Sequence, residues 1–424
     1  MERTRTLILG AGISGLAFAD SLADGDYLVV EAEDEIGGYC RTIERDGFVW
    51  DYAGHFFHFR HPGIERYLLD RMGGQRVLRV QRESRIWYAD RLIDFPFQKN
   101  IHQLPSGEHE ECLEGLRNRP PGETTNFKDM LYSRYGRGIA DKFLIPYNEK
   151  LYATDLERLD VEAMGRFFPH ASMEEILANA HTPTNEGYNA TFTYPAGGAI
   201  QYVHALAKDV RTDRIALGER VTRIDRARKV VVTRKREIGY EILVSSAPLV
   251  SLMDMCGIDY DSNVFSHNKV QVFNLGFDAK GLSGIHWIYY PQRDLSFYRV
   301  GFYDNIFGAK RMSLYVEVGL ARDQRLADQD RARLESRVLR GLERCGVVTN
   351  QRLVASHEVM LDPAYVHVTA ESDRRVAETK KLLGAQGIHT IGRYGSWTYC
   401  SIEDNIVEAR ELAARLGLAA QSPS

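Results

Sequence analysis

Residues 6–15 read TLILGAGISG, and this stretch decides the fold. A short apolar strand leads into the pattern Gly-x-Gly-x-x-Gly, formed by Gly10, Gly12 and Gly15, and an apolar helical pattern follows it. Glycines allow a phosphate to approach the backbone closely, and the N–H groups at the start of a helix attract it. The stretch therefore predicts a pyrophosphate site built from these three glycines and Ser14.

The next apolar strand favours a dinucleotide as the ligand. It ends in Glu31, sixteen residues after Gly15, where a carboxylate can accept hydrogen bonds from a ribose hydroxyl pair. A second glycine pair at 37–38 is followed by Arg41, which suits a second approach to a pyrophosphate; the alternative is a plain turn. Together these features resemble the flavoproteins with two dinucleotide-binding domains, the amine oxidase and protoporphyrinogen oxidase superfamily. The resemblance implies FAD in place of NAD, with Gly38 and Arg41 among its contacts.

The composition indicates an ordinary globular protein of 424 residues, long enough for roughly two or three domains. Its net charge of -4 gives no basic field for nucleic acid. The five cysteines are scattered, which argues against a disulfide framework or a zinc ribbon and favours a reducing compartment. The first strand begins at once, without room for a secretory signal, and no apolar run reaches roughly 18 residues. We expect a cytoplasmic protein with no nucleic-acid or membrane partner; a homo-oligomer is compatible with the sequence.

The order of strand and helix patterns predicts an α/β fold in two parts. A Rossmann-like FAD-binding domain is expected to be discontinuous, and a mixed helical and antiparallel-sheet substrate domain is inserted between its segments. The expected FAD-binding segments are 1–76, 188–250 and 363–424, and the expected substrate segments are 77–187 (helical) and 251–362 (antiparallel sheet).

Two stretches of the helical part carry helix-breaking residues. Residues 105–122 have proline and glycine near both ends and are expected to form a surface connector around a short, charged, helical piece. Pro146 is expected to interrupt the helical pattern between residues 139 and 159.

Several segments resemble, in the same order, the eukaryote-type UDP-galactopyranose mutases, a family of that superfamily. They cover nearly the whole chain: FPFQKNI (95–101), PYNEKLY (146–152), NATFTYPAGG (189–198), WIYYP (287–291), FYR (297–299) and GRYGSWTY (392–399). Two departures stand out. Tyr152 stands where the family usually has tryptophan, and Ala53-Gly54 stands before His55 where a glycine pair is common.

The resemblance implies a role for each matching residue. His55 would lie beside the isoalloxazine on a loop with Gly54, while Arg299 and, with a poorer flanking match, Arg166 would hold a diphosphate. The other residues implied for FAD are Val221, Gly392, Arg393 and Tyr399, and those for the substrate are Phe95, Phe97, Gln98, Tyr147, Asn148, Tyr152, Asn189, Tyr289, Tyr298 and Tyr365. The alternative is a surface ion pair for each arginine and core packing for each tyrosine.

The implied activity is a mutase that interconverts the pyranose and furanose forms of a nucleotide-diphosphate sugar such as UDP-galactose. N5 of reduced FAD would be the nucleophile, and NAD(P)H is a candidate reductant. This role fits the absence of a Gly-x-Ser-x-Gly nucleophile motif. The alternative is an FAD-dependent oxidase or dehydrogenase of the amine oxidase or protoporphyrinogen oxidase type, and a third reading is a flavin-free relative that only binds the sugar nucleotide. The base and the sugar stay open.

Two further patterns could carry other chemistry. His55, His58 and His61 are spaced as metal ligands can be, but the glycine before and the proline after them indicate a loop, so no metal is expected. Cys400 follows Tyr399 near the expected flavin and could form a covalent thioether, although the surrounding block resembles the mutases instead.

Overall fold

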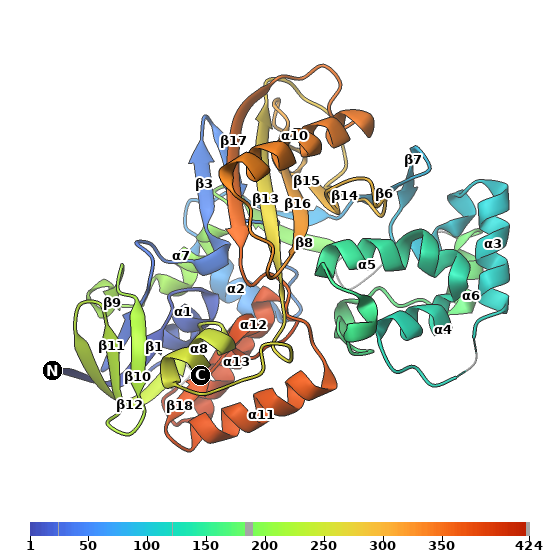
Figure 1. Cartoon of the computed structure of the whole chain (residues 1–424). Helices are drawn as coiled ribbons and strands as arrows, with labels where there is room; N and C mark the ends of the chain where they lie inside the picture. Colours follow the sequence, from blue (N-terminus) through green and yellow to red (C-terminus); the bar gives the residue numbers. More distant parts are fainter. Residues whose placement is uncertain (24, 121, 183–189, 421–424) are drawn as a thin grey trace.

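The structure, a computed structural model, describes residues 1–23, 25–120, 122–182 and 190–420. A seven-stranded sheet holds the first glycine motif, and its middle strands are parallel (Figure 1). Its order is β10 (Val221–Asp225), β11 (Val230–Thr233), β12 (Glu237–Ser245), β1 (Glu2–Leu9), β2 (Tyr27–Val30) and β9 (Ile215–Ala216), with β18 (Ile388–Thr390) paired to β12. Strands from three distant parts of the chain therefore build one nucleotide-binding sheet, as the α/β prediction requires.

Helices cover both faces of this sheet. One face is covered by α1 (Ile13–Asp20), α2 (Pro62–Arg71), α7 (Ile200–Ala207) and α13 (Ile402–Arg415), the other by α8 (Leu249–Cys256) and α11 (Ala370–Gly384). Successive side chains of a strand point to opposite faces. Ile8 accordingly packs in the first core, and Leu7 and Leu9 pack in the second. Because both faces are buried there, β2 (YLVV) is apolar throughout, and so is the end of β1 from Leu7 to Leu9.

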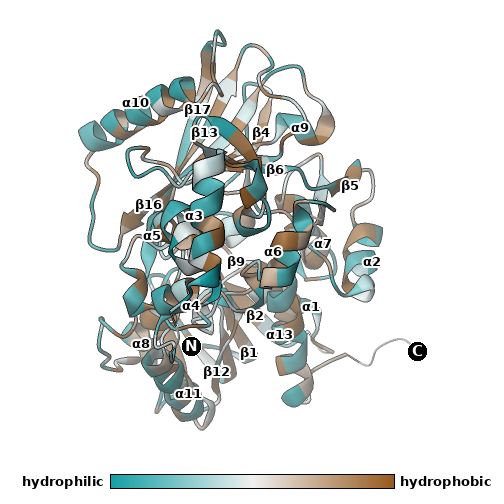
Figure 2. Cartoon of the chain, turned by 90° about the vertical axis from the view of Figure 1, so that its right-hand side faces the viewer, coloured by the Kyte–Doolittle hydropathy of each residue, from teal (hydrophilic) through white to brown (hydrophobic). Residues whose placement is uncertain are grey.

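A second seven-stranded sheet stands above the first in Figure 1 and is mostly antiparallel. Its order is β17 (Leu353–Leu361), β13 (Asn268–Phe277), β16 (Ser313–Ala321), β15 (Arg299–Phe302), β14 (Trp287–Tyr289), β6 (Ser84–Tyr88) and β7 (Arg91–Asp94). Helix α10 (Asp328–Arg344) packs Leu334, Val338 and Leu342 against one face. Figure 2 shows hydrophilic and hydrophobic residues alternating along α10, as expected for a helix with one buried stripe.

Two small strand pairs connect the sheets. The first consists of β3 (Thr42–Arg45) and β4 (Phe48–Asp51), and the second of β5 (Val77–Gln81) and β8 (Thr191–Pro195). The loop that follows β4 carries His55, so this connection places the histidine between the two sheets.

A helical part lies to the side of the second sheet (Figure 1). It contains α3 (Ser106–Arg117), α4 (Phe127–Ile139), α5 (Ile145–Tyr152) and α6 (Met173–Asn179). The helical piece expected between residues 105 and 122 is α3, which begins directly after Pro105; the expectation of a pure surface segment is wrong, because α3 buries Cys112 and Leu116. The expected break at Pro146 is also absent, because this proline lies in the first turn of α5, where its missing N–H costs little. A π-helical turn over Ala140–Leu144 joins α4 to α5.

None of the helices in the described ranges combines the length and the apolar character that crossing a membrane requires.

Candidate active site

A cavity of about 840 Å³ lies at the carboxyl ends of β1 and β2 and extends to the second sheet. This edge of a parallel sheet is where such folds bind their ligands. The second sheet contributes residues of β13, β15 and β16, and the start of α13 closes the opposite side. The predicted residues that line the cavity are Gly10, Gly12, Ser14, Glu31, Gly38, Gly54, His55, Val221, Tyr298, Arg299, Tyr365, Gly392, Arg393 and Tyr399.

Each glycine of the first motif is required for a different structural reason. Gly10 has a φ of +97°, which L side chains rarely adopt, and a Cβ on Gly15 would lie 2.0 Å from the carbonyl oxygen of Gly10. Gly12 is the residue before α1, and no side chain caps the first turn of that helix. The N–H groups at the helix start therefore face the cavity beside Gly12 and suit a phosphate.

Glu31 stands at the end of β2 with its carboxylate fixed by the backbone. One carboxylate oxygen accepts a hydrogen bond from the N–H of Ala11 at 2.7 Å, and the other accepts one from the N–H of Glu33 at 3.0 Å. The residue is buried and lines the cavity. This rigid acid lies beside the glycine turn, as the ribose-binding role requires.

The second glycine pair faces the first motif, but Arg41 does not face the cavity. Gly37 and Gly38 both have positive φ, at +118° and +55°, and a Cβ on Gly12 would lie 3.8 Å from the Cα of Gly38. The Arg41 guanidinium donates to the carbonyl oxygens of Glu35, at 2.8 Å, and Ile36. In this structure Arg41 therefore holds the turn that presents the glycines.

These features fit FAD. The helix start without a side-chain cap suits a pyrophosphate, the buried Glu31 suits a ribose, and Val221 lines the cavity on the other side, where adenine is expected. Ser14 and Asn405 are joined at 3.3 Å and link the start of α1 to α13.

Asp51 anchors the loop that carries His55. Its buried carboxylate accepts hydrogen bonds from the hydroxyl groups of Thr42 and Tyr194, both at 2.7 Å, and from the N–H of Ala199 at 2.9 Å. Burial raises the pKa of Asp51 to about 6. The carboxylate thus ties β4 to β8 and α7 and fixes where the loop leaves the sheet.

His55 lines the cavity together with Arg299 and Arg393. Its Nδ1 is buried and has no hydrogen-bond partner among the described residues. Burial, followed by the charges of Arg393 and Arg299, lowers the pKa of His55 from its usual 6.5 to about 4. The ring is therefore neutral at physiological pH, with an unsatisfied nitrogen where a ligand could meet it.

This shift predicts an acid-sensitive term in stability. The unfolded chain protonates His55 near pH 6.5, but the folded protein does so only near pH 4, so stability falls as the pH decreases between these values. We expect a His55→Gln variant to lose less stability than the unsubstituted protein over this interval, measured by urea unfolding. His61→Gln, a change at an exposed histidine of the same loop, is the control, and parallel curves for His55→Gln and the unsubstituted protein would contradict the assignment.

Arg393 lies over the rings of two cavity tyrosines. Its guanidinium carbon is 4.5 Å from the ring centre of Tyr399 and 5.2 Å from that of Tyr365, and the two rings are stacked 5.8 Å apart. One nitrogen donates to the carbonyl oxygen of Cys400 at 3.1 Å, whereas Nε is buried without a partner in the described ranges. Arg393 follows Gly392, which has a φ of +86° and packs against Ser14, because a Cβ at this position would lie 2.4 Å from the Ser14 Oγ.

Arg299 forms a forked ion pair with a residue that sequence reasoning missed. Its Nε and Nη2 donate to the two carboxylate oxygens of Glu317 at 2.8 and 2.7 Å. The Glu317 side chain is 1% exposed. Burial alone would lower the pKa of Arg299, but the charge of this carboxylate, with smaller contributions from nearby tyrosines, raises it above its usual range. The Tyr298 hydroxyl, also buried, lacks a partner in the described part of the chain. A charged group within the apolar run SLYVEVGLA was the signal that could have revealed Glu317.

The remaining predicted substrate residues pack beside the cavity without lining it. The ring of Tyr289 lies 5.0 Å from Phe95 and 5.3 Å from Tyr147, and Phe97 is fully buried against Phe143. Buried polar atoms without a partner in the described ranges occur on Gln98 (Oε1), Asn148 (Oδ1) and Tyr152 (hydroxyl). Asn189 lies outside the described residues.

Arg166 is the predicted residue that the structure places farthest out. It lies on the single turn Gly165–Phe167, is exposed, and is paired with Asp404. Its neighbour Phe167 does line the cavity. Sequence reasoning also missed Phe167, and no pattern in the sequence pointed to it.

The patterns that suggested other chemistry have local explanations. The structure places no group of three or more His, Cys, Asp or Glu residues where they could hold a metal ion, within the ranges it describes. The Cys400 thiol lies 3.7 Å from the Oδ1 of Asn405, and burial raises its pKa to about 11. The thiol is therefore protonated at neutral pH, and all five cysteines are free of disulfide bonds.

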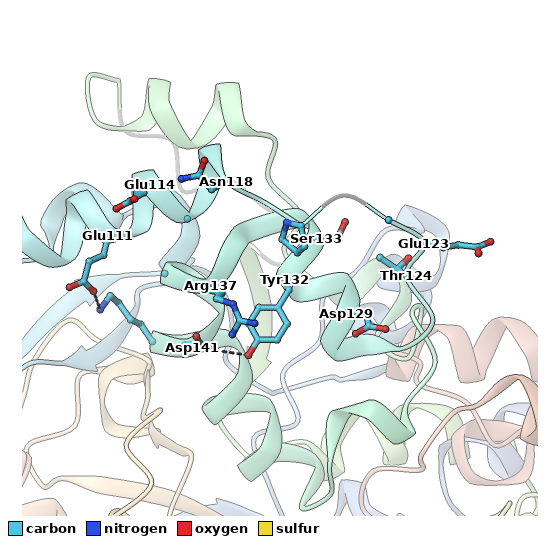
Figure 3. Close-up of a pocket in the computed structure, with 15 residues that line it drawn as sticks. Glu111, Glu114, Asn118, Glu123, Thr124, Asp129, Tyr132, Ser133, Arg137 and Asp141 are labelled. Carbon is cyan, nitrogen blue, oxygen red and sulfur yellow. Dashed lines mark hydrogen bonds and ion pairs between the residues drawn. The ribbon is translucent and has the colours of Figure 1, made fainter.

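A second cavity, of about 610 Å³, lies between α3 and α4 (Figure 3). Several of its charged groups pair with each other: Lys142 with Glu111, and the Tyr132 hydroxyl with Asp141 at 2.7 Å. None of the predicted site residues lines it.

The family model of the flavin containing amine oxidoreductases matches residues 13–249, more than half of the chain. The chain belongs to this family. Membership implies FAD as the cofactor, in agreement with the cavity. The flavoenzyme is 26% identical to chloroplastic protoporphyrinogen oxidase of Nicotiana tabacum over 37% of this chain and 30% of that protein. It is 29% identical to all-trans-retinol 13,14-reductase of Rattus norvegicus over 29% of this chain and 20% of that protein. These matches span a third or less of the relatives' length.

Solved structures resemble the flavoenzyme over nearly its whole length. A reduced UDP-galactopyranose mutase has a TM-score of 0.89 at 24% identity, with 99% of this chain and 96% of that chain covered. Cyclohexylamine oxidase of Brevibacterium oxydans has a TM-score of 0.69 at 16% identity, with 97% and 98% covered. At identities this low, the likeness to these structures establishes the fold alone. The predicted α/β fold, with an FAD-binding domain and a substrate part, is confirmed.

Proposed function

We propose that this flavoenzyme is a mutase that interconverts the pyranose and furanose forms of a nucleotide-diphosphate sugar such as UDP-galactose. The observation that carries the proposal is the arrangement at the flavin end of the cavity. There Arg299 and Arg393 are held beside Tyr298, Tyr365 and Tyr399. Two partly buried guanidinium groups with nearby hydroxyl groups suit an anionic diphosphate better than an amine, which is itself a cation at neutral pH.

The proposed chemistry needs little from the protein beyond binding and charge stabilisation. Reduced FAD, when bound, supplies N5 as the nucleophile, and NAD(P)H is the proposed reductant. Arg299 and Tyr298 hold the diphosphate as it departs and returns, and Arg166 assists from the rim. His55 stays neutral beside the flavin, and its Nδ1 is free to hydrogen-bond to the ring or to the sugar.

The proposed base-binding group lies beside the cavity, where α5 of the helical part meets β14 and the segment that follows β7. Phe95, Phe97, Tyr147 and Tyr289 supply flat apolar surfaces. The unsatisfied polar atoms of Gln98, Asn148 and Tyr152 could bind the edges of a base, and Asn189 belongs to the same proposal. Because Phe97 and Gln98 are fully buried, entry of a base requires the helical part to shift.

We also propose that the FAD-binding and substrate segments meet near residues 76, 187, 250 and 362, and that the protein is cytoplasmic. The five free cysteines support a reducing compartment.

A direct assay separates the two candidate functions. We expect dithionite-reduced protein to convert UDP-galactose to its furanose isomer, detected chromatographically, and the oxidised protein to convert none. Glucose or galactose without the nucleotide should not react, because Arg299 would have no diphosphate to hold. Lack of isomer from any nucleotide sugar tested would remove the mutase proposal.

The second candidate is an oxidase or dehydrogenase. The sequence matches to protoporphyrinogen oxidases favour it. In an oxidase or dehydrogenase, Arg299 and Arg393 would bind the carboxylates of a substrate. Oxygen uptake with an amine or a porphyrinogen, without any sugar-nucleotide isomer, would support this candidate.

A further inference from the structure

Asp404 bridges two arginines from distant parts of the chain at the rim of the cavity. It lies in the first turn of α13, where one of its oxygens accepts hydrogen bonds from the N–H and hydroxyl of Ser401 at 2.7 and 2.8 Å. The other oxygen accepts from Arg60 at 3.2 Å. Arg166 donates to the oxygen that Ser401 contacts. Asp404 therefore joins the His55 loop, α13 and the helical part.

This contact keeps Arg166 outside the cavity. The guanidinium carbon of Arg166 lies 4.3 Å from the ring centre of Phe167, which lines the cavity and contacts Tyr399 edge-on at 5.0 Å. Arg166 is thus one residue from the cavity, but its charge is directed to Asp404. A role in binding diphosphate requires it to leave this partner.

Moving Arg166 from Asp404 to a diphosphate should cost little free energy. The side chains of Arg166 and Asp404 are 35% and 27% exposed, and ion pairs exposed to solvent are weak. Asp404 would keep Arg60 and the Ser401 cap after losing Arg166, so the start of α13 would remain intact.

We propose that Asp404 is a positioning residue that holds Arg166 at the rim as its resting counter-ion, and that a nucleoside diphosphate competes with Asp404 for this arginine. The inference rests on the proposed function and adds a residue that sets substrate affinity. It predicts that Asp404 weakens binding of the diphosphate, because each binding event must break the ion pair.

Replacing Asp404 with asparagine tests the inference. Asparagine keeps an acceptor for the Ser401 cap but removes the charge. We expect Asp404→Asn to bind UDP about two- to fivefold more tightly than the unsubstituted protein, measured by isothermal titration calorimetry. A damaged fold would weaken binding, so a gain in affinity cannot arise from misfolding.

Two comparisons identify the cause of the gain. Adding Asp404→Asn to Arg166→Ala should leave UDP affinity as in Arg166→Ala alone, because the competing pair is already absent. Glu411→Gln removes an exposed carboxylate from the same helix and should not change the affinity. Equal UDP affinity of Asp404→Asn and the unsubstituted protein, or an equal gain without Arg166, overturns the inference. If the unsubstituted protein binds UDP, these results leave the mutase proposal standing; if it binds no nucleoside diphosphate, the two fail together.

Discussion

Arg299→Ala is expected to weaken UDP binding by roughly a hundredfold or more and to abolish sugar-nucleotide turnover. The guanidinium is partly buried and is the cation that the cavity offers next to Tyr298. Truncating one partner of a hydrogen-bonded charge pair that binding buries typically costs about 2–5 kcal/mol. The UDP affinity of Arg299→Lys should lie between those of Arg299→Ala and the unsubstituted protein, because a lysine keeps the charge but cannot form a forked pair of hydrogen bonds. Titration of UDP into each purified variant measures the effect.

The pairing of Arg299 with Glu317 complicates this experiment. Alanine would leave the Glu317 carboxylate, 1% exposed, without its cation, which should destabilise the fold by about 3–5 kcal/mol. A double variant, Arg299→Ala with Glu317→Gln, removes both charges. We expect it to recover most of the lost stability in thermal unfolding but none of the UDP binding. A double variant that binds UDP as the unsubstituted protein does would remove Arg299 from its proposed role.

A matched pair elsewhere controls for the loss of a buried charge pair. Lys280 is bonded to Asp304, whose side chain is fully buried, and neither residue lines the cavity. Lys280→Ala should therefore destabilise the fold by leaving Asp304 unpaired, yet leave UDP affinity unchanged. If Lys280→Ala also weakened UDP binding, general destabilisation would explain both results.

The nucleotide end of the site could be predicted because short-range geometry determines it. The turn from β1 into α1 and the end of β2 lie within one strand-helix-strand unit, so the glycine spacing and Glu31 already specify their relative positions. Apolar periodicity predicted an antiparallel sheet within 251–362, but not that β6 and β7, from the segment expected to be helical, extend it. The helical part was harder. Proline marks helix starts as well as breaks, which is why Pro146 was expected to be an interruption, and the charged surface of α3 concealed the two residues, Cys112 and Leu116, that it buries.

Pairings between distant segments could not be predicted. Arg299 and Glu317 meet because β15 and β16 pair in a particular register, and a one-residue shift would turn one side chain to the other face. Arg166 and Asp404 are 238 residues apart, and only the packing of the helical part against α13 brings them together. Arg41 was expected at the pyrophosphate, but nearby carbonyl oxygens hold its guanidinium. The contacts of FAD and substrate with each residue stay predictions.

Substitutions at Gly12 and Gly15 are expected to separate cofactor binding from folding. A Cβ on Gly12 would lie 3.8 Å from the nearest atom, Gly38 Cα, and its backbone φ of −82° is open to any L residue. The protein should therefore accept a side chain there, but that side chain would occupy the space of the pyrophosphate. We expect Gly12→Ala to weaken FAD binding and Gly12→Val to yield a folded protein without visible flavin absorbance.

Gly15→Ala should act on the fold instead. Its Cβ would lie 2.0 Å from the carbonyl oxygen of Gly10, a backbone atom that cannot move without displacing the β1 turn. Overpacking of this kind costs about 1–3 kcal/mol or more. The thermal stabilities of the Gly12 and Gly15 variants should be compared in FAD-free protein, because bound FAD itself stabilises the folded state. Gly63→Ala, with open space around its Cβ, is the control and should unfold no earlier than the unsubstituted protein, because alanine favours the helix α2 over glycine. If Gly12→Val unfolded as early as Gly15→Ala, Gly12 would serve the fold, and its assignment to the pyrophosphate would lose its support.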